Sequence, residues 1–393
     1  MTSSFRRLFY ALCLLLPLAI RAPAQSTSLL PIHKVLQLAQ RRYAAYMEKY
    51  PDGNLHLYSI RPDGTVQSVT YKDWTSGFFP GVLWKLFDLT GDPRWKKNAI
   101  KWTLSLSPAQ WLTTKHDIGF ILFTSAGNGY SLTHDTVYSN ILHQAAKSLA
   151  TRFNPTVGSI RSWDNGPWSY PVIVDNQMNL ELLFWVATTF GDTSLRHVAV
   201  SHLRNELLYR SRPDGSTLHV LDFDPATGRL LARKTWQGLA DSSCWARGQA
   251  WDIYGLTMAY RYTHITAYLQ QAIKAADYFI GKTESPADAI PRWDFDDPSP
   301  VAPKDASAAA IAASALLELA DYVPAKKQDY LLSATRILQR LCSPDYIGND
   351  QTKSYFLLDH SVVNKPAGKG VDVPVIYADY YFLEALERFE TRK

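Results

Sequence analysis

Apolar residues recur along this chain at intervals of three and four, which is the period of an α-helix. Six segments start with polar residues and then become apolar on nearly every side: residues 74–89, 117–130, 175–190, 245–262, 305–322 and 377–389. Six others keep a charged face: residues 32–50, 93–106, 135–153, 194–209, 267–281 and 326–341. A helix that is apolar all round is buried, whereas an amphipathic helix covers it. The pattern therefore predicts six pairs of one covering and one buried helix.

Short joints link several of these segments. Residues 90–93 read Thr-Gly-Asp-Pro, and residues 190–193 read Phe-Gly-Asp-Thr. Glycine suits the left-handed residue that ends a helix, and aspartate caps the next one. Six such hairpins that close on themselves form an all-α fold, the (α/α)6 barrel, and an open α-solenoid is the main alternative. In the barrel the inner helices run parallel, so their positive N-terminal ends meet on one face.

The first 24 residues have the features of a signal peptide. Arg6 and Arg7 precede an apolar run over residues 8–20, and Ala22-Pro23-Ala24 resembles a cleavage site. We therefore expect residues 1–24 to be removed, and residues 25–393 to form a single domain that is secreted, most simply to the periplasm. An uncleaved N-terminal anchor is the alternative, but the run is short for a membrane span, so no stable membrane anchor is expected.

Charge and cysteine content exclude several classes of protein. Loss of residues 1–24 removes three arginines and no acid, so the formal net charge falls from +5 to +2. No basic cluster remains, which argues against a nucleic-acid partner. Cys244 and Cys342 could pair in an oxidising compartment, although a free buried Cys244 fits its apolar surroundings better. The chain has no spaced Cys/His set for a structural metal.

Two aspartates open buried segments. Asp117 follows His116, and Asp175 precedes Asn176. Each aspartate could be a helix cap, a role worth about 1 kcal/mol. Two carboxylates in one cleft could instead divide the roles of proton donor and charge stabiliser, because each raises the pKa of the other. Polar amides early in an apolar helix need partners or a ligand, so we favour a functional pair.

A second polar group opens the segment 245–262. Trp245, Arg247 and Gln249 offer an indole for stacking, a guanidinium for a carboxylate and an amide for hydroxyl groups, which is the chemistry of a sugar site. Core packing is the alternative for the tryptophan. His219 lies in residues 216–220, the clearest strand signal in the chain, and a surface-loop histidine is the alternative there.

Taken together, these motifs resemble glycoside hydrolase family 88, the unsaturated glucuronyl hydrolases. The resemblance rests on residues 71–81, 116–120, 174–180, 245–251, 305–309 and 377–381, which occur in family order over nearly the whole chain. It implies an (α/α)6 barrel that needs no metal or organic cofactor. It also implies action on the oligosaccharides that polysaccharide lyases leave, whose non-reducing end is a 4,5-unsaturated uronic acid. The vinyl ether of that residue is hydrated, unlike the bond cleaved in ordinary glycoside hydrolysis.

The resemblance also implies roles for individual residues. Asp175 would protonate the sugar and activate water, while Asp117 would position the ring and stabilise its charge. The expected substrate contacts are Trp74, His116, Asn176, His219, Trp245, Arg247 and Gln249. Lys365 and Lys369 are further candidates for contacts with carboxylate or sulfate groups. Two other functions stay open: an unsaturated rhamnogalacturonyl hydrolase, and a glycan-binding relative without catalysis.

Overall fold

The computed structural model describes residues 30–61, 63–283, 288–348 and 354–392. The predicted signal peptide, residues 1–24, lies outside the described residues. From Pro31 onward the chain clusters into one unit. Within the described ranges, no helix combines the length and the hydropathy that crossing a bilayer requires.

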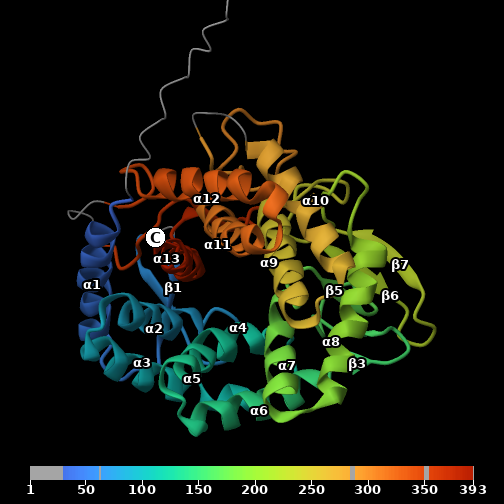
Figure 1. Ribbon diagram of the computed structural model, residues 1–393, viewed down its shortest axis with the longest axis horizontal. Coiled ribbons are helices and arrows are strands. Elements are labelled where there is room, and N and C mark those ends of the chain that lie inside the picture. The colour runs from blue at the N-terminus through green and yellow to red at the C-terminus, as the bar shows by residue number, and fades with distance from the viewer. Residues whose placement is uncertain (1–29, 62, 284–287, 349–353, 393) are drawn as a thin grey trace, which may run out of the picture. The chain divides into compact units, whose positions relative to one another are not determined.

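An inner ring of helices forms the centre of the fold (Figure 1). Its members are α2 (Phe78–Thr90), α4 (Ile118–Leu122) with α5 (Asn128–Thr133), α7 (Asn176–Phe190), α9 (Ala246–Thr263), α11 (Ala306–Tyr322) and α13 (Ile376–Glu390). Neighbours in this order pack against one another, and α13 packs back onto α2. The ring is therefore closed, which confirms the predicted barrel and rules out the open solenoid.

Amphipathic helices cover this ring from outside. They are α1 (Ile32–Lys49), α3 (Pro93–Ser105), α6 (Thr136–Ala150), α8 (Thr193–Asn205), α10 (Thr266–Thr283) and α12 (Lys327–Leu341), with the short helices η1 (Ser107–Trp111), η3 (Glu206–Arg210) and η4 (Pro324–Lys326) between elements. The predicted joints are confirmed. Gly91 and Gly191 end their helices with φ of 67° and 73°, and Asp92 and Asp192 cap the helices that follow.

One inner segment departs from the predicted continuous helix over residues 117–130. A π-helical turn, η2 (Phe123–Gly127), separates α4 from α5. Two side chains of this stretch bond back to the preceding turn: Thr124 Oγ1 donates to the carbonyl of Phe120 at 2.5 Å, and Ser125 Oγ donates to that of Ile121 at 2.7 Å. Such hydrogen bonds to the preceding turn compete with the helical ladder and bend it. The inner helix predicted over residues 74–89 also starts later, at Phe78.

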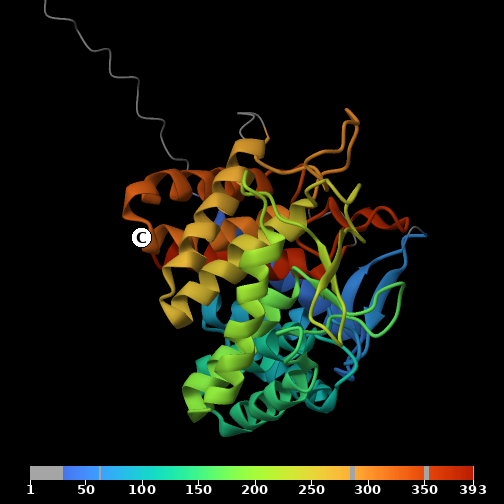
Figure 2. The ribbon, with the colours of Figure 1, turned by 90° about the vertical axis from the view of Figure 1, so that its right-hand side faces the viewer.

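Short antiparallel strands gather at one end of the ring (Figure 2). β1 (His56–Ile60) pairs with β2 (Val66–Val69), β3 (Phe153–Asn154) with β4 (Ser159–Ile160), and β8 (Ser361–Asn364) with β9 (Lys369–Val373), while β5 (Pro171–Ile173), β6 (Val220–Phe223) and β7 (Leu230–Lys234) form a three-stranded sheet in that order. Because β5 leads into α7 and β9 into α13, the strands mark the end at which the inner helices begin. The C-terminus lies at the opposite end of the ring.

Candidate active site

The two aspartates stand at the starts of neighbouring inner helices. Asp117 directly precedes α4 and Asp175 directly precedes α7, yet neither side chain makes a capping hydrogen bond. Asp92, by contrast, caps α3 through its side chain, and Asp135 caps α6 in the same way. Capping therefore does not explain the two aspartates, and the alternative raised by the sequence is wrong for both.

Asn179 joins the starts of α4 and α7. Its Oδ1 accepts a hydrogen bond of 2.8 Å from the backbone N–H of Phe120, and its Nδ2 donates to the carbonyl of Asp175 at 3.1 Å. At Gly119 a Cβ atom would lie 2.6 Å from the Cα of Asn179, so only glycine allows this approach. The amide and the glycine together fix Asp117 relative to Asp175.

Both carboxyl groups hold protons more tightly than ordinary aspartates. Burial, together with the nearby charge of Asp175, raises the pKa of Asp117 to about 7. Burial also raises the pKa of Asp175 to about 6, against the opposing effect of the Arg247 and Arg210 charges. Desolvation disfavours the ionised form of a carboxyl group. A proton can therefore reside on this pair close to neutral pH.

His219 presents an N–H group toward Asp175. Its Nδ1 accepts hydrogen bonds from the backbone N–H groups of Trp236 at 3.1 Å and Gln237 at 3.2 Å, which places the proton on Nε2. Nε2 lies 3.9 Å from Asp175 Oδ2, and both atoms are buried without a hydrogen-bond partner among the described residues. Burial holds the pKa of His219 well below its usual range, so the ring is a neutral donor.

His116 is the matching neighbour of Asp117. Its Nε2 lies 3.3 Å from Asp117 Oδ1. Burial, with a smaller contribution from the Arg152 charge, holds the pKa of His116 well below its usual range. The contact is therefore a polar contact with a neutral imidazole. Each aspartate of the pair has one buried histidine beside it.

The two predicted aromatic walls differ in their exposure. Trp74 is half-buried, and its ring centroid lies 5.0 Å from that of Tyr377 and 5.5 Å from that of Phe120. Trp245 is almost wholly buried, 4.7 Å from the ring of His219 and 4.4 Å from the guanidinium carbon of Arg247. Trp74 thus keeps surface that a ligand can contact, whereas Trp245 supports His219 and Arg247 from behind.

Three residues that were predicted to contact the substrate have hydrogen-bond partners within the protein. Asn176 Oδ1 accepts from the Ser162 hydroxyl at 2.6 Å, and its Nδ2 donates to a backbone carbonyl. Gln249 is fully buried, with its amide bonded to the backbone at residues 215, 217 and 275. Arg247 donates to the carbonyls of residues 362 and 363 and pairs with Asp305 at 3.5 Å. In this structure the three side chains tie segments together, and their contacts with a sugar stay predictions.

The two lysines of the C-terminal hairpin have different surroundings. Lys365 Nζ pairs with Asp297 at 3.1 Å and lies 4.7 Å from the ring centroid of Trp293. Lys369 begins β9 and is exposed. Among the described residues, no group of three His, Cys, Asp or Glu side chains is arranged to hold a metal ion.

A cluster of tryptophans that was not predicted from the sequence lies beside His219. Trp163 lies 6.2 Å from the His219 ring and 6.4 and 6.5 Å from Trp168 and Trp236. Trp236 is 49% exposed. All three tryptophans lie in loops. Their positions outside the predicted helices could have indicated a binding surface, because core packing explains an indole in a loop less readily than one in a helix. The cluster forms a stacking surface next to the acidic pair.

A buried ion pair behind the site was also missed. Arg210 forms a two-point contact with Glu206 in the π-helical turn η3. Its guanidinium also donates to the carbonyls of Val172 at 2.9 Å, Leu218 at 2.8 Å and His219 at 2.6 Å. Because β5 leads to Asp175 and His219 immediately precedes β6, Arg210 holds both site segments from behind.

The fold and the site define a carbohydrate-active hydrolase: a helical barrel that presents two proton-holding carboxyls and stacking indoles at one end. An unsaturated glucuronyl hydrolase of Formosa agariphila is 45% identical to this chain over 334 residues, which cover 84% of the chain and 83% of that relative. A crystal structure of an unsaturated glucuronyl hydrolase specific for heparin matches with a TM-score of 0.88 and 40% identity, over 91% of this chain and 96% of that one. A variant of the Streptococcus agalactiae enzyme in complex with dGlcA-GalNAc6S matches with a TM-score of 0.78 and 29% identity, over 91% of each chain. No protein-family model matches the chain.

The chain therefore belongs to the unsaturated glucuronyl hydrolases, glycoside hydrolase family 88. The family resemblance inferred from the motifs is confirmed, and with it the (α/α)6 barrel.

Proposed function

We propose that this hydrolase removes a 4,5-unsaturated glucuronyl residue from the non-reducing end of glycosaminoglycan-derived disaccharides, and that Asp117, Asp175 and His219 carry out the reaction. The observation behind this assignment is the pair of buried atoms Asp175 Oδ2 and His219 Nε2, which lie 3.9 Å apart without partners among the described residues. A buried polar atom without a partner costs about 1–3 kcal/mol. A bound substrate would satisfy both atoms.

In the proposed reaction the carboxyl group of Asp175 gives its proton to C4 of the double bond. Positive charge then develops at C5 and the ring oxygen, where the carboxylate of Asp117 stabilises it. Water adds to C5 and returns a proton to Asp175, which restores the acid. The resulting hemiketal opens, so that the saturated sugar leaves and an open-chain keto product remains. The raised pKa of both acids supports this role, because the pair keeps a proton close to neutral pH, and the reactive form is the one that holds this proton on Asp175 while Asp117 is ionised.

The surroundings of the pair support a sugar substrate. Trp74 keeps accessible surface and packs against Phe120, three residues after Asp117, and the loop tryptophans 163, 168 and 236 extend the stacking surface beside His219. We assign the unsaturated ring to the space between the aspartates and the second sugar to the loop tryptophans. One relative is specific for heparin and a variant of another binds dGlcA-GalNAc6S, which supports glycosaminoglycan products as the substrate class.

We also propose that the enzyme acts outside the cytoplasm. The support is the sequence of residues 1–24 alone, with its basic start, apolar run and small-residue cleavage site. N-terminal sequencing of protein from a periplasmic extract should find a chain that starts at Gln25, and a chain that keeps residues 1–24 would contradict the proposal.

The test of the reaction is the variant Asp175→Asn. It should fold normally and lose at least about 100-fold in kcat on an unsaturated disaccharide, because general acid catalysis contributes about 10²–10⁴. Turnover is followed as the loss of absorbance of the conjugated double bond. Asp92→Asn is the matched control, because Asp92 caps an outer helix and should not affect kcat. Retained turnover in Asp175→Asn, with a normal fold, would contradict the assignment.

A further inference from the structure

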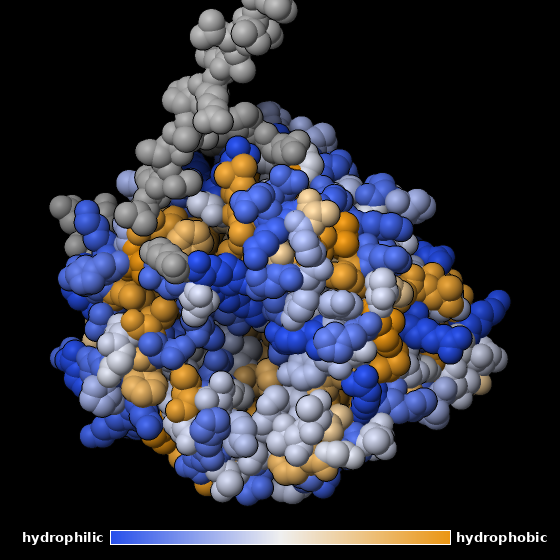
Figure 3. All heavy atoms as spheres, viewed as in Figure 1, coloured by the Kyte–Doolittle hydropathy of each residue, from blue (hydrophilic) through white to orange (hydrophobic). Residues whose placement is uncertain are grey.

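A second cavity, of about 500 Å³, lies inside the helical ring at the end away from the two aspartates. Its lining includes Arg261 and Arg388, in the last turns of α9 and α13, and His134, which ends α5. Asp117 and Asp175 stand instead at the first residues of their helices. In the view of Figures 1 and 3, which faces the C-terminal end of the ring, the surface is hollowed near its middle. The cavity therefore opens on the face opposite the catalytic pair.

Aromatic rings pack together where this cavity approaches the catalytic end. Phe120 lines the cavity. Its ring also packs against Trp74 at 5.5 Å, Phe78 at 5.6 Å and Trp251 at 5.2 Å. Trp251 in turn contacts Tyr381 at 5.3 Å. The charged side chains Arg261 and Arg388 lie at the far ends of their helices, so a ligand that binds beside them enters from the face opposite the catalytic pair.

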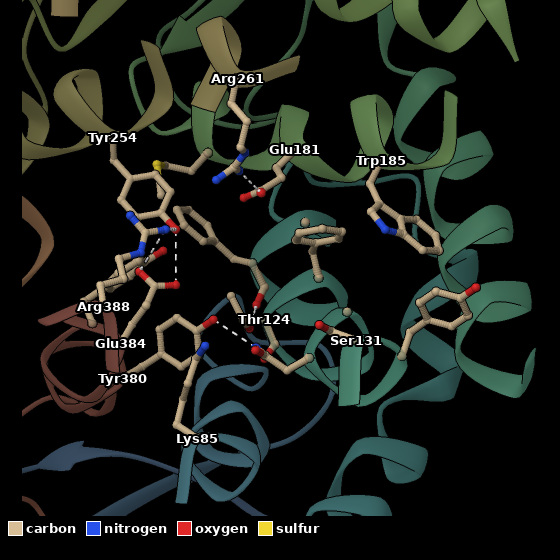
Figure 4. A pocket seen from close by; sticks show the side chains of 18 of the residues that line it. Lys85, Thr124, Ser131, Glu181, Trp185, Tyr254, Arg261, Tyr380, Glu384 and Arg388 are labelled. Carbon is tan, nitrogen blue, oxygen red and sulfur yellow. Dashed lines mark hydrogen bonds and ion pairs between the residues drawn. The ribbon is translucent and has the colours of Figure 1, made fainter. Parts of the chain in front are cut away.

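One wall of the cavity carries a linked set of charges (Figure 4). Arg261 pairs with Glu181 and, at 2.8 Å, with Glu318. Arg388 pairs with Glu318 at 2.8 Å and with Glu384 at 3.8 Å. Three carboxylates thus surround two guanidinium groups, which leaves one negative charge in excess.

The excess charge is best placed at Glu181, because Glu384 also accepts hydrogen bonds from the hydroxyls of Tyr254 at 3.2 Å and Ser314 at 2.5 Å. Among the described residues, the ionic partner of Glu181 is Arg261, which Glu318 also binds. Burial raises the pKa of Glu181, Arg261 opposes this, and the neighbouring carboxylates Glu318 and Glu384 raise it again. Repulsion between carboxylates is relieved by an added cation. The other cation of the lining, Lys85, is held by Glu387 at 2.6 Å and does not supply it.

Aromatic side chains stand next to this carboxylate. Glu181 and Trp185 are one turn apart on α7, so both side chains lie on the same face of the helix, and both line the cavity. The ring of Trp185 contacts Tyr130 at 5.1 Å and Phe123 at 6.2 Å. A carboxylate in a cavity that is also lined by aromatic rings is a combination that recognises organic ammonium ions. The volume lies within the range of about 300–1,000 Å³ that is usual for small-molecule sites.

We propose that this cavity binds a small organic ammonium compound of about the size of an amino sugar, with its ammonium group at Glu181 and its body against Trp185 and Tyr130. Tyr254 makes the charged wall rigid, because its hydroxyl accepts from Arg388 at 3.1 Å and donates to Glu384 at 3.2 Å. The proposal is independent of the function proposed for the catalytic end.

Isothermal titration calorimetry with glucosamine, at neutral pH, tests the proposal. N-acetylglucosamine is the matched neutral probe. We expect one glucosamine per chain, and binding of N-acetylglucosamine at least about tenfold weaker, because a charged partner roughly doubles the strength of a hydrogen bond. No saturable binding of glucosamine to the folded enzyme, or equal binding of the two sugars, would overturn it.

Variants locate the site. Glu181→Gln should weaken glucosamine at least about tenfold, whereas Asp175→Asn, at the other end of the ring, should leave it unchanged. If Glu181→Gln does not fold, Ser131→Trp serves instead, because Ser131 is exposed and lines the cavity, and it should block binding without a change in melting temperature. Binding that is lost in Asp175→Asn, or kept in both Glu181→Gln and Ser131→Trp, would contradict the site.

Discussion

At the scale of single residues, burial lets the carboxyl groups of Asp117 and Asp175 keep protons at a pH where exposed aspartates are ionised. Both carboxyls are desolvated, and both have a raised pKa. Neither side chain offsets the cost of its burial by capping a helix. Such an arrangement is unfavourable for stability but useful for proton transfer to carbon.

The pH dependence of the reaction follows from the pKa of the acid. A proton donor must be protonated, so the rate falls as the pH rises past its pKa. Burial raises the pKa of Asp175 to about 6. We therefore expect kcat to be highest on the acid side of neutral and to fall about tenfold per pH unit in clearly alkaline buffer. A pH–rate profile with an unsaturated disaccharide measures this, and full activity in alkaline buffer would contradict the role of Asp175 as acid.

The same physics predicts a stability effect at Asp117. Its folded pKa, about 7, lies above that of the unfolded chain. Ionisation therefore favours the unfolded chain, and stability falls as the pH rises toward 7. The variant Asp117→Asn carries no charge, so it should raise the melting temperature in mildly alkaline buffer and change it little in acid.

Asp92→Asn is the control of opposite sign. A hydrogen bond from Arg94 lowers the pKa of Asp92, so its ionised form stabilises the fold and its loss should lower the melting temperature at neutral pH. Thermal unfolding at several pH values tests both variants. A lower melting temperature for Asp117→Asn in alkaline buffer would contradict the raised pKa.

The residue types of the site could be predicted from the sequence, but the direction of each side chain could not. His219 was expected at the site, and the structure puts its Nε2 near Asp175. Asn176 and Gln249 come from equally polar surroundings, yet their partners are backbone groups 16 to 34 residues away. Which side-chain amide binds which distant backbone group becomes visible only in the folded chain.

At the scale of elements, the close contact of α4 and α7 sets the distance between the two acids. Gly119 permits it, since a Cβ atom there would meet Asn179 at 2.6 Å. Gly119→Ala should therefore push the helix starts apart, destabilise the protein by about 1–3 kcal/mol and lower kcat more than it changes KM. Chemical unfolding and steady-state kinetics measure the two effects.

Gly281→Ala provides the matched control. Gly281 lies in α10, where a Cβ atom would meet nothing within 4 Å, and alanine there should stabilise the protein by up to about 1 kcal/mol. Equal effects of the two substitutions would mean that the contact of α4 with α7 does not position the acids.

Helical periodicity predicted the inner and outer elements because apolar faces dominate the energy of packing. It did not predict the π-helical turn η2, because Thr124 and Ser125 also suit a regular helix. The short strands were largely missed as well. Strands of two to five residues leave too little alternation to detect.

At the scale of the whole molecule, ring closure gives the barrel two different ends. Parallel inner helices bring their starts, the strands and the acidic pair to one end, and the linked charges of the second cavity to the other. Twelve repeated helical segments could predict the ring, because each hairpin must bury its apolar helix against a neighbour. The location of the second cavity could not be predicted, since it is lined by five inner segments whose side chains meet only after closure.

The central claim is that this enzyme acts on a carbon–carbon double bond. The most direct test compares one disaccharide in two forms, with the 4,5-double bond of its uronic acid present or reduced, and measures release of the second sugar by chromatography. We predict that the enzyme releases this sugar from the unsaturated form alone, because the saturated ring offers Asp175 no carbon to protonate. Release from the saturated disaccharide at a comparable rate would contradict the claim.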